Sequence, residues 1–149
     1  MDTSLRITKY HNYDAEGNLV SARDEWTSYF DIGVKVSVDD YILVENEYVN
    51  FVLSLCDLLS VEKFTLSELE VFDDKGSVEY PEVVDVTVLP LLVRDVLREK
   101  IWCKLVADEM EVHFGYDFYM YVICPLSLDF IKYKMNTQLN VESFKSPYM

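Results

Sequence analysis

Residue types on which many functional sites depend are scarce in this sequence of 149 residues. It has four glycines, no two of them close together, so no glycine-rich loop can hold a nucleotide phosphate. Its three cysteines, Cys56, Cys103 and Cys124, are too few for a disulfide framework and too scattered for a Cys-x-x-Cys metal site. Each lies in an apolar run, where a reduced thiol behaves as a small core residue. We therefore expect no cofactor and no bound metal.

Basic residues are also scarce, at 13 Lys and Arg against 27 Asp and Glu, which gives a net charge of −14. Such a chain repels phosphate backbones, so we expect no direct nucleic-acid partner. The longest uncharged run, residues 118–128, is too short to cross a bilayer, which takes roughly 20 residues. The first ten residues carry charges where a signal peptide has an apolar stretch. We expect a cytoplasmic protein without a membrane partner.

The sequence contains enough apolar residues to form a hydrophobic core. Half of its residues are hydrophobic and 14% are aromatic, which is too apolar for a disordered acidic chain. A chain of this length buries roughly 68–70% of its unfolded surface on folding, enough for one core. No internal repeat or Pro/Gly/Ser-rich linker divides it. Residues 1–149 are expected to form a single domain.

Hydrophobic periodicity predicts two main helices. Ser37, with Asp40 three residues later, resembles a capping box, and the apolar residues that follow recur at three- and four-residue steps for about five turns. Glu45 lies off this apolar stripe and is expected in solvent. A second helix is expected to begin near Thr87, with Pro90 in its first turn, where a missing N–H costs little.

The other periodic segments alternate as strands do. Strands are predicted over residues 5–10, 26–30, 63–71, 101–106, 110–114, 118–124 and 139–144, with a short helix over 126–135. The segment 26–30 is expected to pair with 5–10, and the segments from 101 to 124 form an antiparallel meander. The predicted fold class is α/β in the loose, α+β sense: a mostly antiparallel sheet with two or three packed helices.

Catalytic residues are few, and the histidine at position 113 is the one that lies near several carboxylates. The structural interpretation is a half-exposed strand histidine paired with an acidic residue. The alternative is a small acidic hydrolase in which His113 acts with Asp108 or Asp117, and it requires a pocket around the imidazole. A second alternative is a self-associating scaffold that buries the sheet face of Tyr119 and Tyr121. We expect a protein without enzymatic activity.

The distribution of charge favours a protein partner. Residues 62–85 contain eight acidic side chains against Lys63 and Lys75, and a negative surface of this kind suits a basic protein. The alternative, that the charge serves solubility alone, stays open. The candidate contact residues all lie in predicted loops, where binding residues concentrate. They are Asp73, Asp74, Glu79, Glu82, Asp108, Glu109, Tyr116 and Asp117.

Six stretches of the sequence, taken in order, resemble one family. They are ITKY (7–10), DEWTSYFDIG (24–33), YILVENEYVNFVL (41–53), VRDVLREKIWCKL (93–105), HFGYDFYMYV (113–122) and ESFKSPY (142–148). They resemble the small cytoplasmic immunity proteins encoded beside polymorphic toxins, including those of contact-dependent growth inhibition. The resemblance implies a protein that binds the C-terminal domain of a cognate toxin, often an RNase, tRNase or DNase. Such a protein blocks the active site or substrate groove of the toxin and performs no chemistry. The resemblance supplies no toxin-contact residue.

Overall fold

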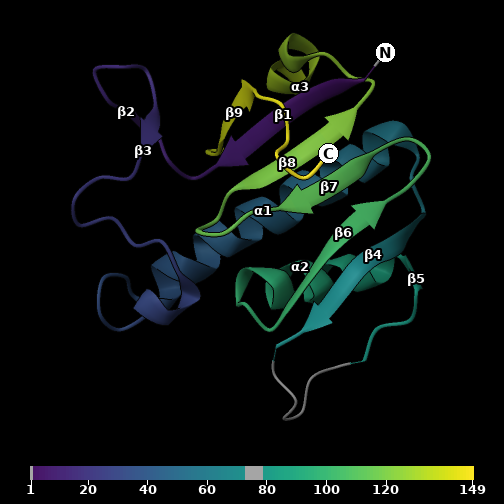
Figure 1. The fold of residues 1–149 in the computed structure, drawn as a ribbon, viewed down its shortest axis with the longest axis horizontal. Coiled ribbons are helices and arrows are strands. Elements are labelled where there is room, and N and C mark those ends of the chain that lie inside the picture. Colours follow the sequence, from purple (N-terminus) through teal and green to yellow (C-terminus); the bar gives the residue numbers. More distant parts are fainter. Residues whose placement is uncertain (1, 73–78) are drawn as a thin grey trace.

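The computed structural model describes residues 2–72 and 79–149 (Figure 1). Its strands are β1 (Thr3–Thr8), β2 (Asn12–Tyr13), β3 (Leu19–Val20), β4 (Lys63–Val71), β5 (Val83–Asp85), β6 (Ile101–Val106), β7 (Glu111–Phe114), β8 (Met120–Cys124) and β9 (Asn140–Ser143). Its helices are α1 (Val38–Leu59), α2 (Leu89–Leu97) and α3 (Leu128–Lys134), with short 3₁₀ turns η1 (Tyr29–Asp31) and η2 (Val86–Val88).

Seven strands form one antiparallel sheet in the order β5-β4-β6-β7-β8-β1-β9, and β2 pairs with β3 in a separate hairpin. Helices α1 and α2 lie on one face of the sheet (Figure 1). The predicted fold class, a mostly antiparallel sheet with packed helices, is confirmed. None of the described helices is both long enough and apolar enough to cross a lipid bilayer.

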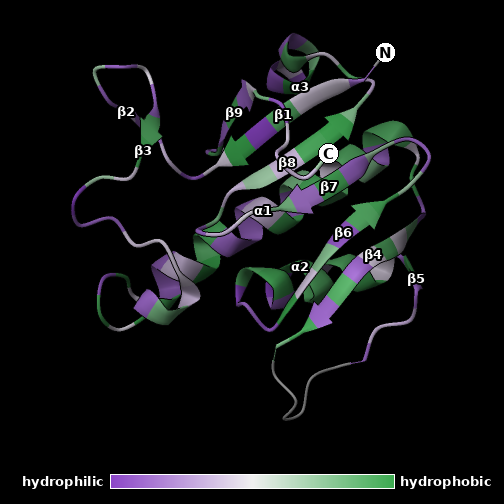
Figure 2. Ribbon diagram, viewed as in Figure 1, coloured by the Kyte–Doolittle hydropathy of each residue, from purple (hydrophilic) through white to green (hydrophobic). Residues whose placement is uncertain are grey.

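The core lies between the sheet and these two helices. Along β6, residues alternate between buried and half-buried. Hydrophobic and hydrophilic residues alternate in the same way from Ile101 to Leu105, and Figure 2 colours the strand by this property. The buried members, such as Cys103 and Leu105, face α1 and α2 in one continuous cluster. Phe118 joins this cluster at the edge of the meander, with its ring edge-on to the rings of Tyr41 and Tyr48.

Local hydrogen bonds mark the start of α1, and left-handed residues follow the ends of both α1 and α2. The Ser37 hydroxyl accepts a hydrogen bond from the Asp40 N–H at 3.1 Å, which confirms the predicted start of α1. The chain leaves α1 through Ser60, whose φ of 55° is left-handed, and leaves α2 through Glu99 at 59°. After α2, the Lys100 N–H reaches back to the Asp95 carbonyl at 2.9 Å. This is the Schellman ending, whose left-handed position is usually occupied by glycine.

The predicted strand over residues 26–30 is wrong. The segment is a loop that leads into η1, and β1 pairs instead with β8 and β9. Ser28 caps η1, and the Asp31 carboxylate accepts the backbone N–H groups of Thr27 and Ser28. Such local hydrogen bonds compete with a strand ladder. The apolar pattern reflects packing, because the Trp26 ring lies edge-on to Phe118.

The expected exposure of Glu45 is also wrong. Its side chain is 0% exposed and accepts two hydrogen bonds from the Arg98 guanidinium, at 2.8 and 2.9 Å. The Tyr41 hydroxyl donates a third, at 2.6 Å. A charge buried in this way is retained because a partner of opposite charge compensates for lost hydration. Glu45 therefore ties α1 to α2 within the core.

The cysteines are core residues, as predicted, and all three are free thiols. Burial raises the pKa of Cys103 to about 12 and that of Cys56 to about 11. Because the thiolate is the reactive form, the folded protein should not react with a disulfide reagent such as DTNB at pH 8. Three thiols should react once the chain is unfolded in guanidinium. A native thiol that reacts at the rate of free cysteine would contradict the burial of that side chain.

Candidate protein-binding surface

Acidic side chains gather at one end of the sheet, where the C-terminus of α1, the start of β4, β5 and the β6–β7 turn come together at the right of Figure 1. We call this the acidic end, and it consists of Asp57, Glu62, Asp85, Asp108 and Glu109. All five side chains are exposed. Two adjoining hollows, which share Ser60 and Glu62, are lined by four of them: Asp57, Glu62, Asp108 and Glu109. The larger hollow is an open groove of about 550 Å³. Asp85 lies on β5 between Val83 and Val86, which belong to the two linings.

The helix dipole adds to the negative potential of the acidic end. Helix α1 points its C-terminus there, and the C-terminus of a helix carries roughly half a negative charge. Its last turn has no basic residue, and Asp57 lies in it instead. An acidic residue at this position is unfavourable for the helix. The arrangement thus concentrates negative potential at the expense of helix stability.

Few cations compensate for these charges. Lys63 is the basic residue among those that line the two hollows, and it lies opposite Asp85 across the β4–β5 pair. Hydrogen bonds from Thr87 hold the pKa of Asp85 below its usual value, with a smaller contribution from Lys63. The Asp85 carboxylate therefore stays charged even in mildly acidic solution.

The same imbalance extends over the described surface. Eighteen Asp and Glu residues are exposed there against seven Lys and Arg residues. The five half-buried cations all pair with carboxylates: Arg6 with Glu142, Lys9 with Glu25, Arg94 and Arg98 with Glu45, and Lys104 with Glu68. The net negative charge of the sequence therefore lies at the surface, because the half-buried basic residues are paired with carboxylates.

The structure brings together some of the predicted contact residues and separates others. Asp108 and Glu109 lie in the acidic end, and the exposed Glu82 adjoins it, one residue before Val83 of the groove lining. Glu79 is exposed in the irregular segment before β5. Tyr116 and Asp117 lie in the β7–β8 turn at the opposite end of the sheet, because successive hairpin turns of a meander alternate between ends.

The two remaining candidates, Asp73 and Asp74, lie outside the described residues. Conversely, Asp57, Glu62 and Asp85 belong to the acidic end although they were not among the predicted contacts. Two of them, Glu62 and Asp85, fall within the acidic stretch 62–85 noted in the sequence. Asp57 lies outside that acidic stretch, and only the packing of α1 against the sheet brings it to the acidic end.

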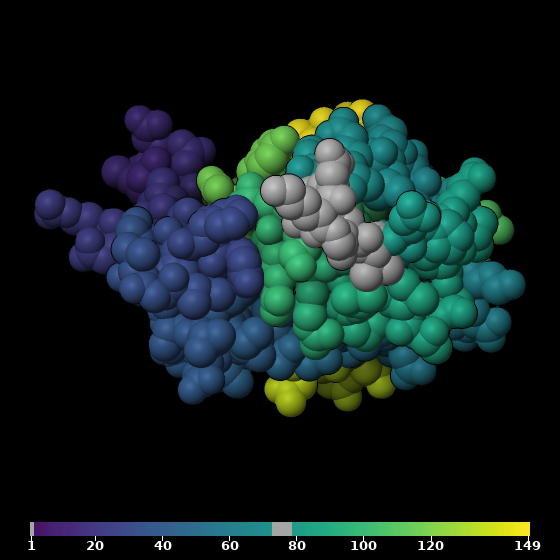
Figure 3. Space-filling model, turned by 90° about the horizontal axis from the view of Figure 1, so that it is seen from below, coloured from purple at the N-terminus to yellow at the C-terminus, as the bar shows by residue number. Residues whose placement is uncertain are grey.

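The opposite end of the sheet carries a small hollow. Figure 3 views this region, where residues of the 20–40 segment (dark blue) lie beside the green residues of α2, β6 and the β7–β8 turn. We call it the aromatic hollow. Its floor is formed by the buried Val96, Leu97, Ile101 and Phe118, and around them lie Thr27, Phe72, Glu99, Trp102, Gly115, Tyr116 and Asp117.

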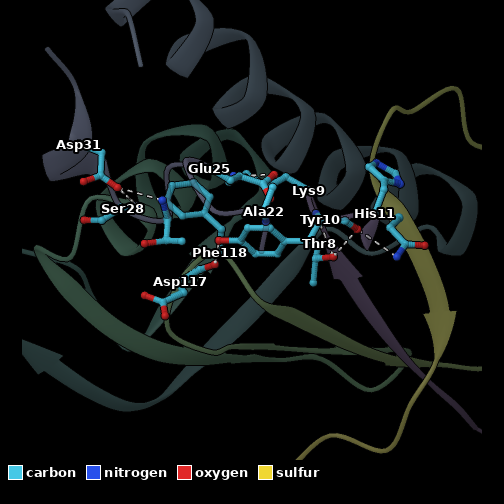
Figure 4. A network of polar contacts seen from close by, with 12 residues as sticks. Thr8, Lys9, Tyr10, His11, Ala22, Glu25, Ser28, Asp31, Asp117 and Phe118 are labelled. Carbon is cyan, nitrogen blue, oxygen red and sulfur yellow. Dashed lines mark hydrogen bonds and ion pairs between the residues drawn. The ribbon is translucent and has the colours of Figure 1, made fainter. Parts of the chain in front are cut away.

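Hydrogen bonds from distant parts of the chain hold the β7–β8 turn in place. The Tyr10 hydroxyl donates to the Asp117 carbonyl at 2.6 Å (Figure 4). The Tyr48 hydroxyl donates to the Phe118 carbonyl at 2.7 Å. Both donors are almost fully buried. The turn that bears Tyr116 and Asp117 is therefore a rigid platform.

A lysine fastens the neighbouring 22–31 segment to the same region. The Lys9 ammonium lies 3.3 Å from a Glu25 carboxylate oxygen (Figure 4). It also lies 4.1 Å from the centroid of the Trp26 ring. Burial lowers the pKa of Lys9, and Glu25 partly offsets this effect. Beyond it, the Ser28 hydroxyl donates to the Glu99 carboxylate at 3.2 Å. This loop thus packs directly beside the aromatic hollow.

The prediction that His113 is half-exposed is wrong, although its pairing with a carboxylate is confirmed. The ring is 2% exposed, its Nε2 lies 3.1 Å from Glu111 and its Nδ1 lies 2.8 Å from the Ser146 hydroxyl. In the neutral ring, Nε2–H donates to the carboxylate, and Nδ1 accepts from the hydroxyl. A hollow of about 620 Å³ adjoins the ring, but neither nitrogen is free to take a proton from a substrate.

The sheet face that carries Tyr121 is covered by the segment 144–149. Tyr121 is 6% exposed, and its ring centroid lies 6.0 Å from those of both Phe144 and Tyr148. Because the covering segment already buries Tyr121, this part of the face offers little apolar surface for self-association.

The described residues contain no group of three His, Cys, Asp or Glu side chains placed to hold a metal ion. Comparison with protein-family models, with curated proteins and with solved structures gave no match. Function is therefore inferred from the surfaces of this chain.

Proposed function

We propose that this protein is an immunity protein, which binds a cationic toxin domain through its acidic end and thereby keeps substrate from the active site. The observation that carries the proposal is the acidic end itself, where five exposed carboxylates lie together near the C-terminus of α1 and Lys63 is the basic residue in the linings of the adjoining hollows. The resemblance of several stretches to immunity proteins supports the same function.

Electrostatics indicates the class of toxin. A nuclease needs a basic groove to hold phosphates, and an acidic surface that lies in or beside that groove excludes the substrate. Complementary charges also raise the rate of association, by roughly 10- to 1000-fold in steered complexes. Speed matters here because one free nuclease molecule cuts many substrates. We infer that the partner is a nuclease domain, either RNase, tRNase or DNase.

The proposal predicts a toxin gene beside the gene of this protein, and the test uses the C-terminal domain of that toxin. The purified protein should bind this domain with a Kd in the nanomolar range or below, abolish its nuclease activity at one equivalent, and bind more weakly as salt is raised. A basic nuclease of unrelated sequence serves as the control and should stay active. Absence of binding at low salt, or equal inhibition of both nucleases, would contradict the proposal.

A hydrolase that uses His113 is the second candidate, because a hollow adjoins the imidazole. It requires the ring to exchange its bond to Ser146 or Glu111 for one to substrate. Conversion of a metabolite by the purified protein, lost in a folded His113→Gln variant, would favour this candidate over the immunity protein.

A further inference from the structure

The aromatic hollow has the size of a side chain rather than of a metabolite. It has room for about 40 Å³ of water-sized molecules, whereas one water takes roughly 10–15 Å³ and small-molecule sites run to roughly 300–1,000 Å³. Its floor is apolar and buried. The occupant that such a hollow can take is the end of one side chain from another protein.

The rim of the hollow combines aromatic rings with carboxylates. Tyr116 is 70% exposed and Phe72 is 52% exposed, so both rings present apolar surface to solvent. Glu99 and Asp117 are exposed as well, and neither makes an ion pair within the part of the chain that the structure describes. A flat cation bonds to carboxylates through its N–H groups and is attracted to aromatic faces.

The backbone at the rim holds Glu99 at a position where glycine would fit better. Glu99 has a left-handed φ of 59° at the Schellman position of α2, which favours glycine, and Asp117 follows with 58° and Phe118 with 68°. Left-handed backbone is unfavourable for residues with a Cβ, and it is rare for a bulky residue. Strained positions of this kind cluster at functional sites.

We propose that the aromatic hollow receives an arginine side chain of the protein partner. The guanidinium meets the carboxylates of Glu99 and Asp117, and its aliphatic stem lies against the rings of Tyr116 and Phe72. The inference rests on the proposed function for the identity of the partner. In this arrangement the acidic end raises the rate of association, and the bound arginine holds the partner in place. The two places are separated by about the length of β6, roughly 20 Å, which one interface of about 800 Å² per partner can cover.

The direct test is a titration of the ¹⁵N-labelled protein with N-acetyl-arginine amide, followed by NMR. Saturable shifts are expected for the amides of Glu99, Tyr116 and Asp117 and for the Trp102 indole, with a Kd on the order of 10 mM or tighter. The neutral isostere N-acetyl-citrulline amide should produce no saturable shift. Equal responses to both probes, or no saturation with arginine, would overturn the inference.

Matched variants separate this site from the acidic end. The pair Glu99→Gln and Asp117→Asn should weaken the arginine probe roughly 5-fold or more, because it loses both charge-assisted contacts. The pair Asp108→Asn and Glu109→Gln removes the same charge elsewhere and should leave the probe affinity within about 2-fold. Equal losses in both pairs would mean that the probe senses net charge only, and the hollow would not be an arginine site.

Glycine at the two left-handed helix ends gives a further comparison. Glu99→Gly and Ser60→Gly should each raise the unfolding temperature by a few degrees, because glycine adopts this backbone without strain. Only Glu99→Gly should weaken the arginine probe. If both variants bind the probe as the parent does, Glu99 is not part of the site.

The fate of the toxin complex distinguishes the two proposals. If the hollow does not bind the probe while the neighbouring toxin domain is still neutralised, the arginine anchor is wrong and the proposed function stands. If the probe binds as expected but the toxin domain does not bind, the hollow is a site for a cationic protein other than that toxin.

Discussion

Replacement of Glu45 by alanine is expected to lower the free energy of unfolding by about 3–5 kcal/mol. The carboxylate is fully buried and accepts hydrogen bonds from Arg98 and Tyr41. Its removal leaves the Arg98 guanidinium without its counter-ion beside the core. Such an unpaired charge accounts for most of the free energy lost when a buried ion pair is broken. Urea denaturation followed by circular dichroism measures the effect as a lower midpoint at unchanged slope.

Two further variants identify the cause. Asn50→Ala, at an exposed position of the same helix, should change stability by no more than about 0.5 kcal/mol. The double variant Glu45→Leu with Arg98→Leu removes both charges and should recover most of the loss. A loss below about 1 kcal/mol for Glu45→Ala would show that this network contributes little to stability.

Reversal of charge at the acidic end should slow the binding of the toxin domain. Asp108→Lys together with Glu109→Lys is expected to reduce the association rate constant about 10- to 100-fold at low ionic strength, because the pair replaces attraction by repulsion. The difference should shrink as salt is raised, since the Debye length falls to about 8 Å near 0.15 M. Stopped-flow mixing over a series of salt concentrations gives both quantities.

A control with equal change of net charge is available in the N-terminal part of the chain. Glu16→Lys together with Asp24→Lys alters two exposed residues far in sequence from the acidic end. This pair should slow association by less than about 3-fold. If the two pairs slow association equally, total charge rather than the acidic end steers the partner; if neither does, the binding surface lies elsewhere.

Local patterns predicted much of the fold. The start of α1 at Ser37, the strand over residues 63–71 and the meander from 101 to 124 follow from capping and periodicity, which involve residues close in sequence. The failures have a different origin. Glu45 is buried because Arg98, 53 positions later, reaches its carboxylate, and no period along α1 carries that information. Trp26 packs against the core from a loop, and this packing accounts for the apolar pattern that predicted a strand.

The candidate site shows the same division. The acidic character of residues 62–85 is plain in the sequence, and so are the loops that hold Asp108 and Tyr116. The sequence does not show which of these residues lie together, because their grouping depends on which strands pair and where α1 ends against the sheet. That packing joins Asp57 to Asp108 and places Tyr116 at the other end.

By itself, the sequence determined the composition-level properties and the local elements: the excess of acid, one α+β domain, the long helix and the meander. Each of these depends on composition or on residues a few positions apart, which a linear chain displays directly. Only the tertiary structure decided which charges are compensated and which converge. Those outcomes depend on strand order and helix packing, which bring together residues that are distant in the chain.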